Sequence, residues 1–239
     1  MGTGQNITSF AGADVYRMTG AEPFGLRPGL ALQLAHIAPA ATFRTEFIIQ
    51  DSPIIFGFML AGLNHCQYSE GALRNIKGTH GGGSNRITYL PETVGSMECK
   101  GGMHRLSIIV SREFLEPYLS AETARVPQTL AGALSGKKEA FQWAGQRSIR
   151  KMRLVADIFT NSYSGPLRRL HLESRALELI GLQLAEYLAP DNPAPPPTLK
   201  VSDINRIRDA RELLVQDMEN PPSIAQLARM AGINEKKLK

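Results

Sequence analysis

The stretch that most limits what this chain can fold into is residues 221–239, PPSIAQLARMAGINEKKLK. Ser223 can cap a helix, and the apolar residues after it recur at the spacing of one helix face, which predicts a short helix ending near Met230. Gly232 can adopt the left-handed conformation that closes a helix, and Asn234 can cap a second one. The pattern predicts a helix-turn-helix, with an arbitrary α-hairpin as the alternative. The residues expected in its shared core are Leu227, Ala228, Ala231, Ile233 and Leu238.

This stretch resembles the first helix-turn-helix of the AraC/XylS family of bacterial transcription regulators. The resemblance covers residues 201–239 and implies an all-α DNA-binding domain with a helix before the motif, whose expected buried face is Ile204, Ile207, Ala210, Leu214 and Met218. The family has two such motifs, so the resemblance implies that this domain is truncated at Lys239, inside the first recognition helix, and that the chain is a shortened form of a longer regulator. It also implies that DNA is contacted by Asn234, Glu235, Lys236, Lys237 and Lys239.

The N-terminal half of the chain has the pattern of a β-protein. Residues 1–28 are rich in Gly, Thr and Pro and are expected to be irregular. Strand-length runs with β-branched or aromatic residues then alternate with Gly and Pro, which predicts a sandwich or small barrel over 29–120. The glycine-rich segment 78–83 is expected to be a loop at the barrel mouth. The expected strands are 30–37, 43–49, 54–60, 63–68, 86–90, 94–100 and 104–110.

After Val110 the apolar period becomes helical. Ser111 is expected to cap a short helix at 111–119, and 120–145 shows no clear pattern. Two amphipathic helices at 146–163 and 166–188 are expected to pack as an antiparallel pair. The expected apolar stripes are Ile149, Met152, Ala156 and Phe159 on the first helix, and Leu167, Leu170, Leu177, Leu184 and Leu188 on the second.

The second stripe is longer than the first helix is expected to cover, so apolar surface would be left exposed on a monomer. We therefore predict a homodimer formed through the helical region 121–189, with the helix packing wholly on the barrel as the alternative. The leucines expected at the interface are Leu170, Leu177, Leu184 and Leu188. The run PDNPAPPPT cannot continue a helix, which predicts a linker at 190–200.

A barrel, a helical pair, a linker and a helix-turn-helix follow one another in AraC-family regulators that sense small molecules. The segments DSPIIFGFMLAG, ITYLPETVG and HRLSIIVSREFL resemble the siderophore-responsive, pyochelin-regulator-like branch of that family. The resemblance implies an α+β protein with a cupin-like β-barrel for ligand sensing, a helical pair where subunits meet, and the start of a DNA-binding domain. It also implies a small-molecule effector such as a ferric siderophore, with DNA and RNA polymerase as partners.

Strand alternation gives a candidate ligand site inside the barrel. Phe56, Phe58 and Leu60 are expected to point to one side of their strand, and Tyr68 and Tyr89 can share that interior. These side chains predict an apolar, aromatic-lined cavity of the size that holds a drug-sized ligand. A filled hydrophobic core is the alternative.

Other features of the sequence argue against an enzyme. The five histidines include no H-x-H or H-x-x-x-H pair, so we expect no metal site, no cofactor and no catalytic residue. Cys66 and Cys99 are expected to be core residues.

The net charge of +5 is only weak support for DNA binding. With no signal peptide and no apolar run of about 18 residues, we expect a cytoplasmic protein without a membrane partner. A cupin-type enzyme or a plain ligand-binding protein is the alternative function.

Overall fold

The structure is a computed structural model that describes residues 16–18, 23–37, 42–50, 52–120, 126–189, 210, 213–214 and 222–235. The chain divides into two compact units, Met1–Pro193 and Ala194–Lys239, which we describe separately. The division falls inside the proline-rich run 190–198. Within the described residues, no helix is both long enough and apolar enough to span a membrane.

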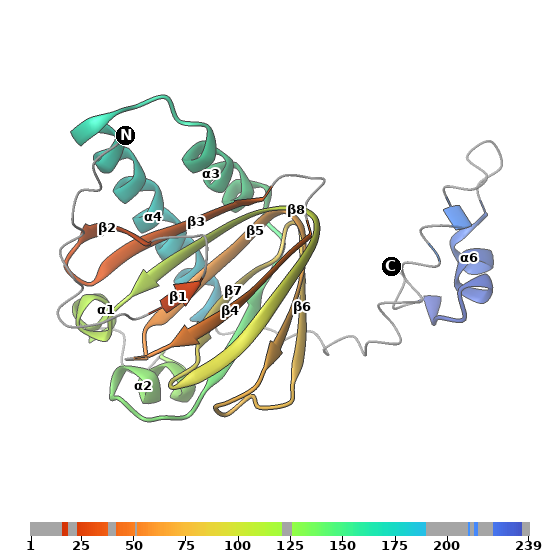
Figure 1. Ribbon diagram of the computed structural model, residues 1–239, viewed down its shortest axis with the longest axis horizontal. Helices are drawn as coiled ribbons and strands as arrows, with labels where there is room; N and C mark the ends of the chain where they lie inside the picture. The colour runs from red at the N-terminus through yellow and green to blue at the C-terminus, as the bar shows by residue number, and fades with distance from the viewer. Residues whose placement is uncertain are drawn as a thin grey trace. The chain divides into compact units, whose positions relative to one another are not determined.

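The first unit is built on a single antiparallel sheet (Figure 1). Among the described residues it has nine strands: β1 Tyr16–Met18, β2 Pro23–Arg27, β3 Leu30–Ile37, β4 Thr42–Ile49, β5 Ile54–Tyr68, β6 Lys77–Gly81, β7 Asn85–Tyr89, β8 Thr93–Val110 and β9 Phe141–Gly145.

The two long strands β5 and β8 pair with each other and divide the sheet into two halves. The end of β8 also pairs with β3, and the start of β5 also pairs with β7. These segments of β8 and β5, together with β3, β7, β2 and β9, form one half of the sheet, which we call the helix-side half. The start of β8 pairs with β4 and the end of β5 with β6; these parts, with β1, form the outer half. Apolar side chains from both halves share one core cluster, so the sheet folds over on itself. The α+β class is confirmed, with an open cupin-like sheet in place of a closed barrel.

The fold in the sheet lies where both long strands contain glycine. Gly62 in β5 has φ +92°, and Gly101 and Gly102 in β8 have φ +79° and +84°. The pairing register of β5 shifts on both sides of this point, between Met59 and Ala61 and between Gly62 and Asn64. These glycines were expected to separate strands, but they bend continuous strands because positive φ allows a bulge without a turn.

Helices cover one face of the helix-side half (Figure 1). They are α1 Arg112–Leu119, α2 Gln128–Leu134, α3 Ile149–Thr160 and α4 Gly165–Tyr187. Ser111 caps α1 as predicted, since its side chain accepts a hydrogen bond from the backbone N–H of Phe114. Arg150 contacts Glu178 whereas Asp157 contacts Arg175, so residues later in α3 meet residues earlier in α4. The predicted antiparallel pairing of these two helices is therefore confirmed.

The apolar stripes predicted for the two helices are shifted around the helix axis. On α3 the buried residues are Lys151, Leu154, Val155 and Ile158, whereas Ile149 is exposed and Met152, Ala156 and Phe159 are half-buried. On α4 the buried residues are Leu172, Ala176, Leu179, Ile180, Gln183, Leu184 and Tyr187. Both buried faces contain a polar residue, Lys151 and Gln183. A stripe chosen by apolar residues alone misses such positions, and this moves its centre.

Four strands lie where the sequence predicted none. Strands β1 and β2 fall in the segment expected to be irregular, β6 falls in the expected glycine-rich loop, and β9 falls in the stretch without a pattern. Strands β6 and β9 are stabilised by pairing with β5 and β7. Such pairing depends on neighbours distant in sequence, so local residue preference does not reveal it.

The second unit contains α6 Ile224–Met230. Ser223 caps this helix as predicted and forms a capping box with Gln226, and Gly232 follows with φ +63°. The small core of this unit is Ala210, Leu227, Ala228, Ala231 and Ile233, with Leu213 packed against it. Leu214, expected on the buried face, is exposed. Leu238, Ile204, Ile207 and Met218 lie outside the described residues.

Candidate ligand-binding site

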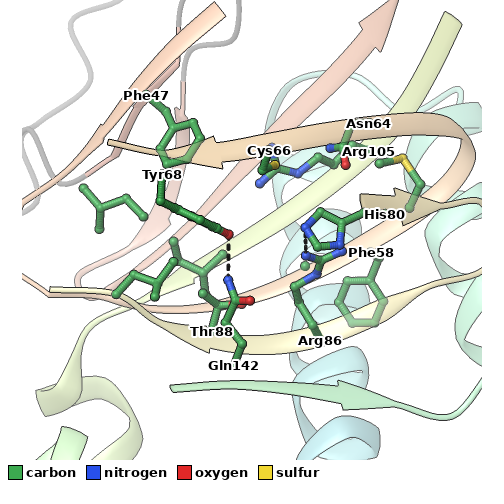
Figure 2. A pocket seen from close by; sticks show the side chains of 15 residues that line it. Phe47, Phe58, Asn64, Cys66, Tyr68, His80, Arg86, Thr88, Arg105 and Gln142 are labelled. Atoms are coloured by element: carbon green, nitrogen blue, oxygen red, sulfur yellow. Dashed lines mark hydrogen bonds between the residues drawn. The ribbon is translucent and has the colours of Figure 1, made fainter. Parts of the chain in front are cut away.

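A cavity lies between the two halves of the folded sheet (Figure 2). Its lining comes from β4, β6 and the end of β5 in the outer half, and from the start of β5, β7, β9 and the end of β8 in the helix-side half. The volume is about 60 Å³. Pockets for drug-sized ligands are typically about 300–1,000 Å³, so the cavity as it stands has room for only a small chemical group.

Two arginines give the cavity a positive charge. Arg86 on β7 and Arg105 on β8 both line it, and among the described lining residues none is acidic. A guanidinium group stays protonated in proteins, so burial does not remove these charges. The site therefore favours an anionic ligand over a cationic one.

His80 on β6, in the outer half, also lines the cavity and is neutral. Burial, and next the charges of Arg86 and Arg105, lower the pKa of His80 to about 2. A neutral imidazole can accept a hydrogen bond, and Arg86 Nη1 donates to His80 Nε2 (Figure 2). His80 therefore orients Arg86 and does not add to the positive charge.

Asn64 and Thr88 add buried polar atoms to the apolar part of the lining. Asn64 Nδ2 donates to Met97 Sδ at 3.0 Å and lies 3.9 Å from Met103 Sδ. The other end of this amide, Oδ1, has no protein partner among the described residues, and neither has Thr88 Oγ1. Most buried polar atoms in proteins are paired, so two orphaned ones in one cavity need an explanation.

Tyr68 and Gln142 connect the two halves at another part of the cavity. Gln142 Nε2 on β9 donates to the hydroxyl oxygen of Tyr68 at 2.7 Å (Figure 2). The Tyr68 ring also meets Phe47 edge to face, with 5.9 Å between ring centroids. These contacts fix Tyr68 in the wall of the cavity.

Both cysteines are buried. Burial raises the pKa of Cys66, partly offset by Arg105 and Arg86, and burial also raises the pKa of Cys99. Both thiols are therefore protonated at neutral pH, and a thiol is a poor nucleophile. Across the described part of the chain, no three His, Cys, Asp or Glu side chains lie close enough together to hold a metal ion.

The structure does not bring the five predicted ligand-binding residues together. Phe58 and Tyr68 line the cavity, but Phe56 and Tyr89 are buried in the core beneath the helices, and Leu60 packs against that core. The cavity side of β5 instead presents Ile55, Gly57 and Met59. The alternation of side chains along β5 correctly separates its two faces, but both faces are covered in the folded protein. The helices cover the more aromatic face, and the cavity lies on the other.

Sequence reasoning missed Arg86, Arg105, Asn64 and Thr88. The available signal was a polar residue at every second position of a strand expected to be buried, as in Arg86-Ile87-Thr88-Tyr89. Such alternation normally marks a solvent-facing side, and only the folded-over outer half shows that this side is enclosed.

The leucines predicted at the subunit interface have different environments. Leu184 is buried in the core beneath the helices, and Leu177 and Leu188 are packed against that core. Leu170 is 66% exposed, and its neighbour on the helix surface, Leu167, is 64% exposed.

Of the predicted DNA-contacting residues, Asn234 and Glu235 are exposed, whereas Lys236, Lys237 and Lys239 lie outside the described residues.

A buried polar network connects the sheet to the two long helices. Lys151 Nζ on α3 donates to Asn85 Oδ1 on β7 at 2.9 Å and also to Glu186 Oε2 on α4. Gln183 Nε2 on α4 donates to the same Asn85 oxygen at 3.1 Å, and Asn85 Nδ2 donates to the Gln146 carbonyl at 2.9 Å. Asn85 is next to Arg86 in β7, so the network lies directly beside the cavity wall.

The fold is thus an open cupin-like sheet folded over a charged cavity, with the helical pair packed on the helix-side half of the sheet. The chain belongs to the family described as the regulatory protein PchR N-terminal domain, whose model matches residues 17–200. The chain is also 40% identical over 121 residues to the regulatory protein PchR of Pseudomonas aeruginosa, covering 50% of this chain and 40% of that protein. The chain thus spans less than half of that relative. The predicted resemblance to the pyochelin-regulator-like branch of the AraC/XylS family is confirmed.

Solved structures of regulators also align with most of the chain. ToxT from Vibrio cholerae is 10% identical with a TM-score of 0.37, covering 88% of this chain and 73% of ToxT. The AraC-like transcriptional activator CuxR is 10% identical with a TM-score of 0.33, covering 88% of this chain and 73% of CuxR. At these scores the alignments support no inference about ligands or mechanism.

Proposed function

We propose that the chain is the ligand-sensing part of a transcription regulator, in which an effector bound in the cavity changes how the helix-turn-helix segment is presented to DNA. The observation that carries this proposal is the cavity itself: two arginines and two orphaned polar atoms face an enclosed space in a domain of the PchR family. Charged and unpaired polar groups destabilise a purely structural core, so their presence favours a binding role.

The resemblance to the siderophore-responsive branch suggests a ferric siderophore as the effector. Such a complex is larger than a cavity of about 60 Å³. Binding therefore requires either that the two halves of the sheet move apart or that only one chemical group of the effector enters. The Gln142 to Tyr68 hydrogen bond joins the two halves and would be broken if they separate.

The remaining partners follow from the C-terminal segment and the family. We infer that the longer regulator binds DNA through Asn234, Glu235, Lys236, Lys237 and Lys239, acts in the cytoplasm and contacts RNA polymerase. The exposure of Asn234 and Glu235 just after the Gly232 turn supports this inference. A cupin-type enzyme is the less supported alternative, because the Cys66 thiol is protonated and, among the described residues, no three His, Cys, Asp or Glu side chains lie close enough together to hold a metal ion.

Isothermal titration calorimetry of the 239-residue protein tests the sensing role. We expect at least one ferric siderophore, ferric pyochelin first, to bind with a dissociation constant in the micromolar range or below, and the iron-free siderophore to bind more weakly. A matched test measures DNA binding by the longer regulator with and without the same complex. Absence of binding by every ferric siderophore in the series would contradict the siderophore assignment, and DNA binding indifferent to a bound effector would contradict the regulatory role.

We also propose that the protein is a homodimer, with Leu167 and Leu170 of α4 at the interface. Burying a leucine contributes about 1.5–3 kcal/mol, so two per subunit can offset much of the cost of association. Light scattering should show a dimer for the wild type and a folded monomer for Leu167→Glu with Leu170→Glu. Leu184→Glu is the contrasting variant, because it places a charge in the subunit's own core and should unfold the protein. A wild-type monomer, or a double variant that still dimerises, would rule out this interface.

A further inference from the structure

The cavity contains two buried polar atoms that the protein leaves without a hydrogen-bond partner among its described residues. They are the side-chain carbonyl oxygen of Asn64, in a residue only 1% exposed, and the hydroxyl oxygen of Thr88, in a residue 6% exposed. Both residues line the same enclosed space but come from different halves of the sheet (Figure 2). An unpaired buried polar atom destabilises the folded protein, so two of them facing one cavity favour a bound molecule that completes both.

The orientation of the Asn64 amide is determined by its neighbours. One end of the amide faces Met97 Sδ at 3.0 Å and Met103 Sδ at 3.9 Å. A thioether sulfur can accept a hydrogen bond but cannot donate one, so the NH₂ group must be at this end. The carbonyl is therefore the end without a partner, and a carbonyl requires an N–H or O–H donor from whatever occupies the cavity.

The charge of the site specifies a second feature of the occupant. Arg105 is adjacent to the Asn64 amide, because its Nη1 lies 3.5 Å from the same Met97 sulfur. Arg86, on β7 in the same half of the sheet as Arg105, also lines the cavity and is oriented by His80. Charge-assisted hydrogen bonds from guanidinium to an anionic oxygen are about twice as strong as neutral ones, and more so away from bulk water.

We propose that the cavity recognises a chemical group that combines an anionic oxygen with a hydrogen-bond donor, as in a hydroxyl-bearing aromatic carboxylate. Arg105 and Arg86 pair with the anion, Asn64 Oδ1 accepts the donor, and the Thr88 hydroxyl forms a further hydrogen bond. The Tyr68 and Phe47 rings in the wall suit a planar, partly apolar group. This assignment rests on the proposed sensing function, because it takes the cavity to be where the effector enters.

The test uses the three isomeric hydroxybenzoates as probes in calorimetric titrations, with their methoxy analogues and phenol for comparison. A methoxy analogue keeps the anion and loses the donor, whereas phenol keeps the donor and loses the anion. The wild type should bind at least one hydroxybenzoate about tenfold or more tightly than its methoxy analogue, and phenol should bind most weakly. Asn64→Leu should abolish the preference for hydroxyl over methoxy, and Arg105→Met should weaken all benzoates while leaving phenol unchanged.

Two control variants remove a similar side chain outside the cavity, so that an effect on probe binding can be assigned to the cavity residue. Gln33→Leu removes another buried amide, on β3 outside the lining, and should leave the hydroxyl preference intact. Arg74→Met removes an exposed charge and should leave benzoate binding intact. If Asn64→Leu does not fold, Thr88→Val gives the second measurement and should weaken the same probes. Hydroxybenzoates that bind no better than methoxybenzoates would overturn the proposal, as would water alone occupying the site, seen as no probe binding to a folded wild type.

The outcome for the effector separates this inference from the proposed function. If a ferric siderophore binds and regulates DNA binding, but Asn64→Leu and Arg105→Met bind it like the wild type, the assignment of the recognised group is wrong and the sensing role stands. If neither a siderophore nor a hydroxybenzoate binds, both are wrong. If both bind and the two variants weaken both, the recognised group of the effector has the proposed chemistry.

Discussion

Replacing Lys151 by methionine should destabilise the first unit by about 3 kcal/mol, measured as the free energy of unfolding in urea. The methionine keeps the apolar stem of the side chain and removes the ammonium group, which is buried with only 3% of the residue exposed. Glu186 then loses its ion-pair partner in a half-buried position, and Asn85 Oδ1 loses one of its two donors. The estimate is at the low end for a broken buried pair, because Glu186 remains partly accessible to water.

Two further variants show whether the unpaired charge is the cause. Adding Glu186→Gln to Lys151→Met removes the orphaned charge while an amide oxygen can still accept the Gln146 backbone N–H, so most of the lost stability should return. Arg150→Met breaks an exposed ion pair on the same helix, to Glu178, and should change stability by less than about 0.5 kcal/mol. A Lys151→Met variant as stable as Arg150→Met would mean that the buried network contributes little.

The first helix of the C-terminal motif was predictable because its signals are local. Ser223 caps the helix from the residue before it, and Gly232 ends it a few residues later, so both can be identified without knowing what the helix packs against. The antiparallel helices α3 and α4 were found for the same reason. Their buried faces were misplaced because Lys151 and Gln183 are in the core, where their partners Asn85 and Glu186 come from distant parts of the chain.

The candidate site was not predictable in the same way, because enclosure is a property of the folded sheet. Alternation shows that Phe56 and Ile55 point to opposite faces, but it does not show which face is covered by helices and which by the outer half of the sheet. The aromatic residues pack under the helices, and the polar residues of β7 line the cavity. Arg86 and Thr88 would have been assigned to solvent by the usual rule, and only the pairing of β6 and β4 with the long strands places them inside.

Gly62→Ala should destabilise the first unit by about 4 kcal/mol, through two costs that add. An alanine at φ +92° would have a strained backbone conformation, which costs about 1–3 kcal/mol. Its Cβ would also clash, because it would lie 2.3 Å from the Gly102 carbonyl oxygen and 2.9 Å from Met103 Cα. Both obstructing atoms belong to the backbone of β8, so no side-chain rotation relieves the clash, and β5 and β8 must separate where the sheet folds over.

Gly181→Ala is the matched control for this substitution. Gly181 lies inside α4, and a Cβ there meets no atom within 4 Å, so the same chemical change should stabilise the protein by about 0.5–1 kcal/mol through helix propensity. Urea unfolding of the two variants should therefore give effects of opposite sign. A Gly62→Ala protein within about 1 kcal/mol of wild type would show that the two long strands do not depend on this glycine to bend, and that the cavity between the two halves is formed in another way.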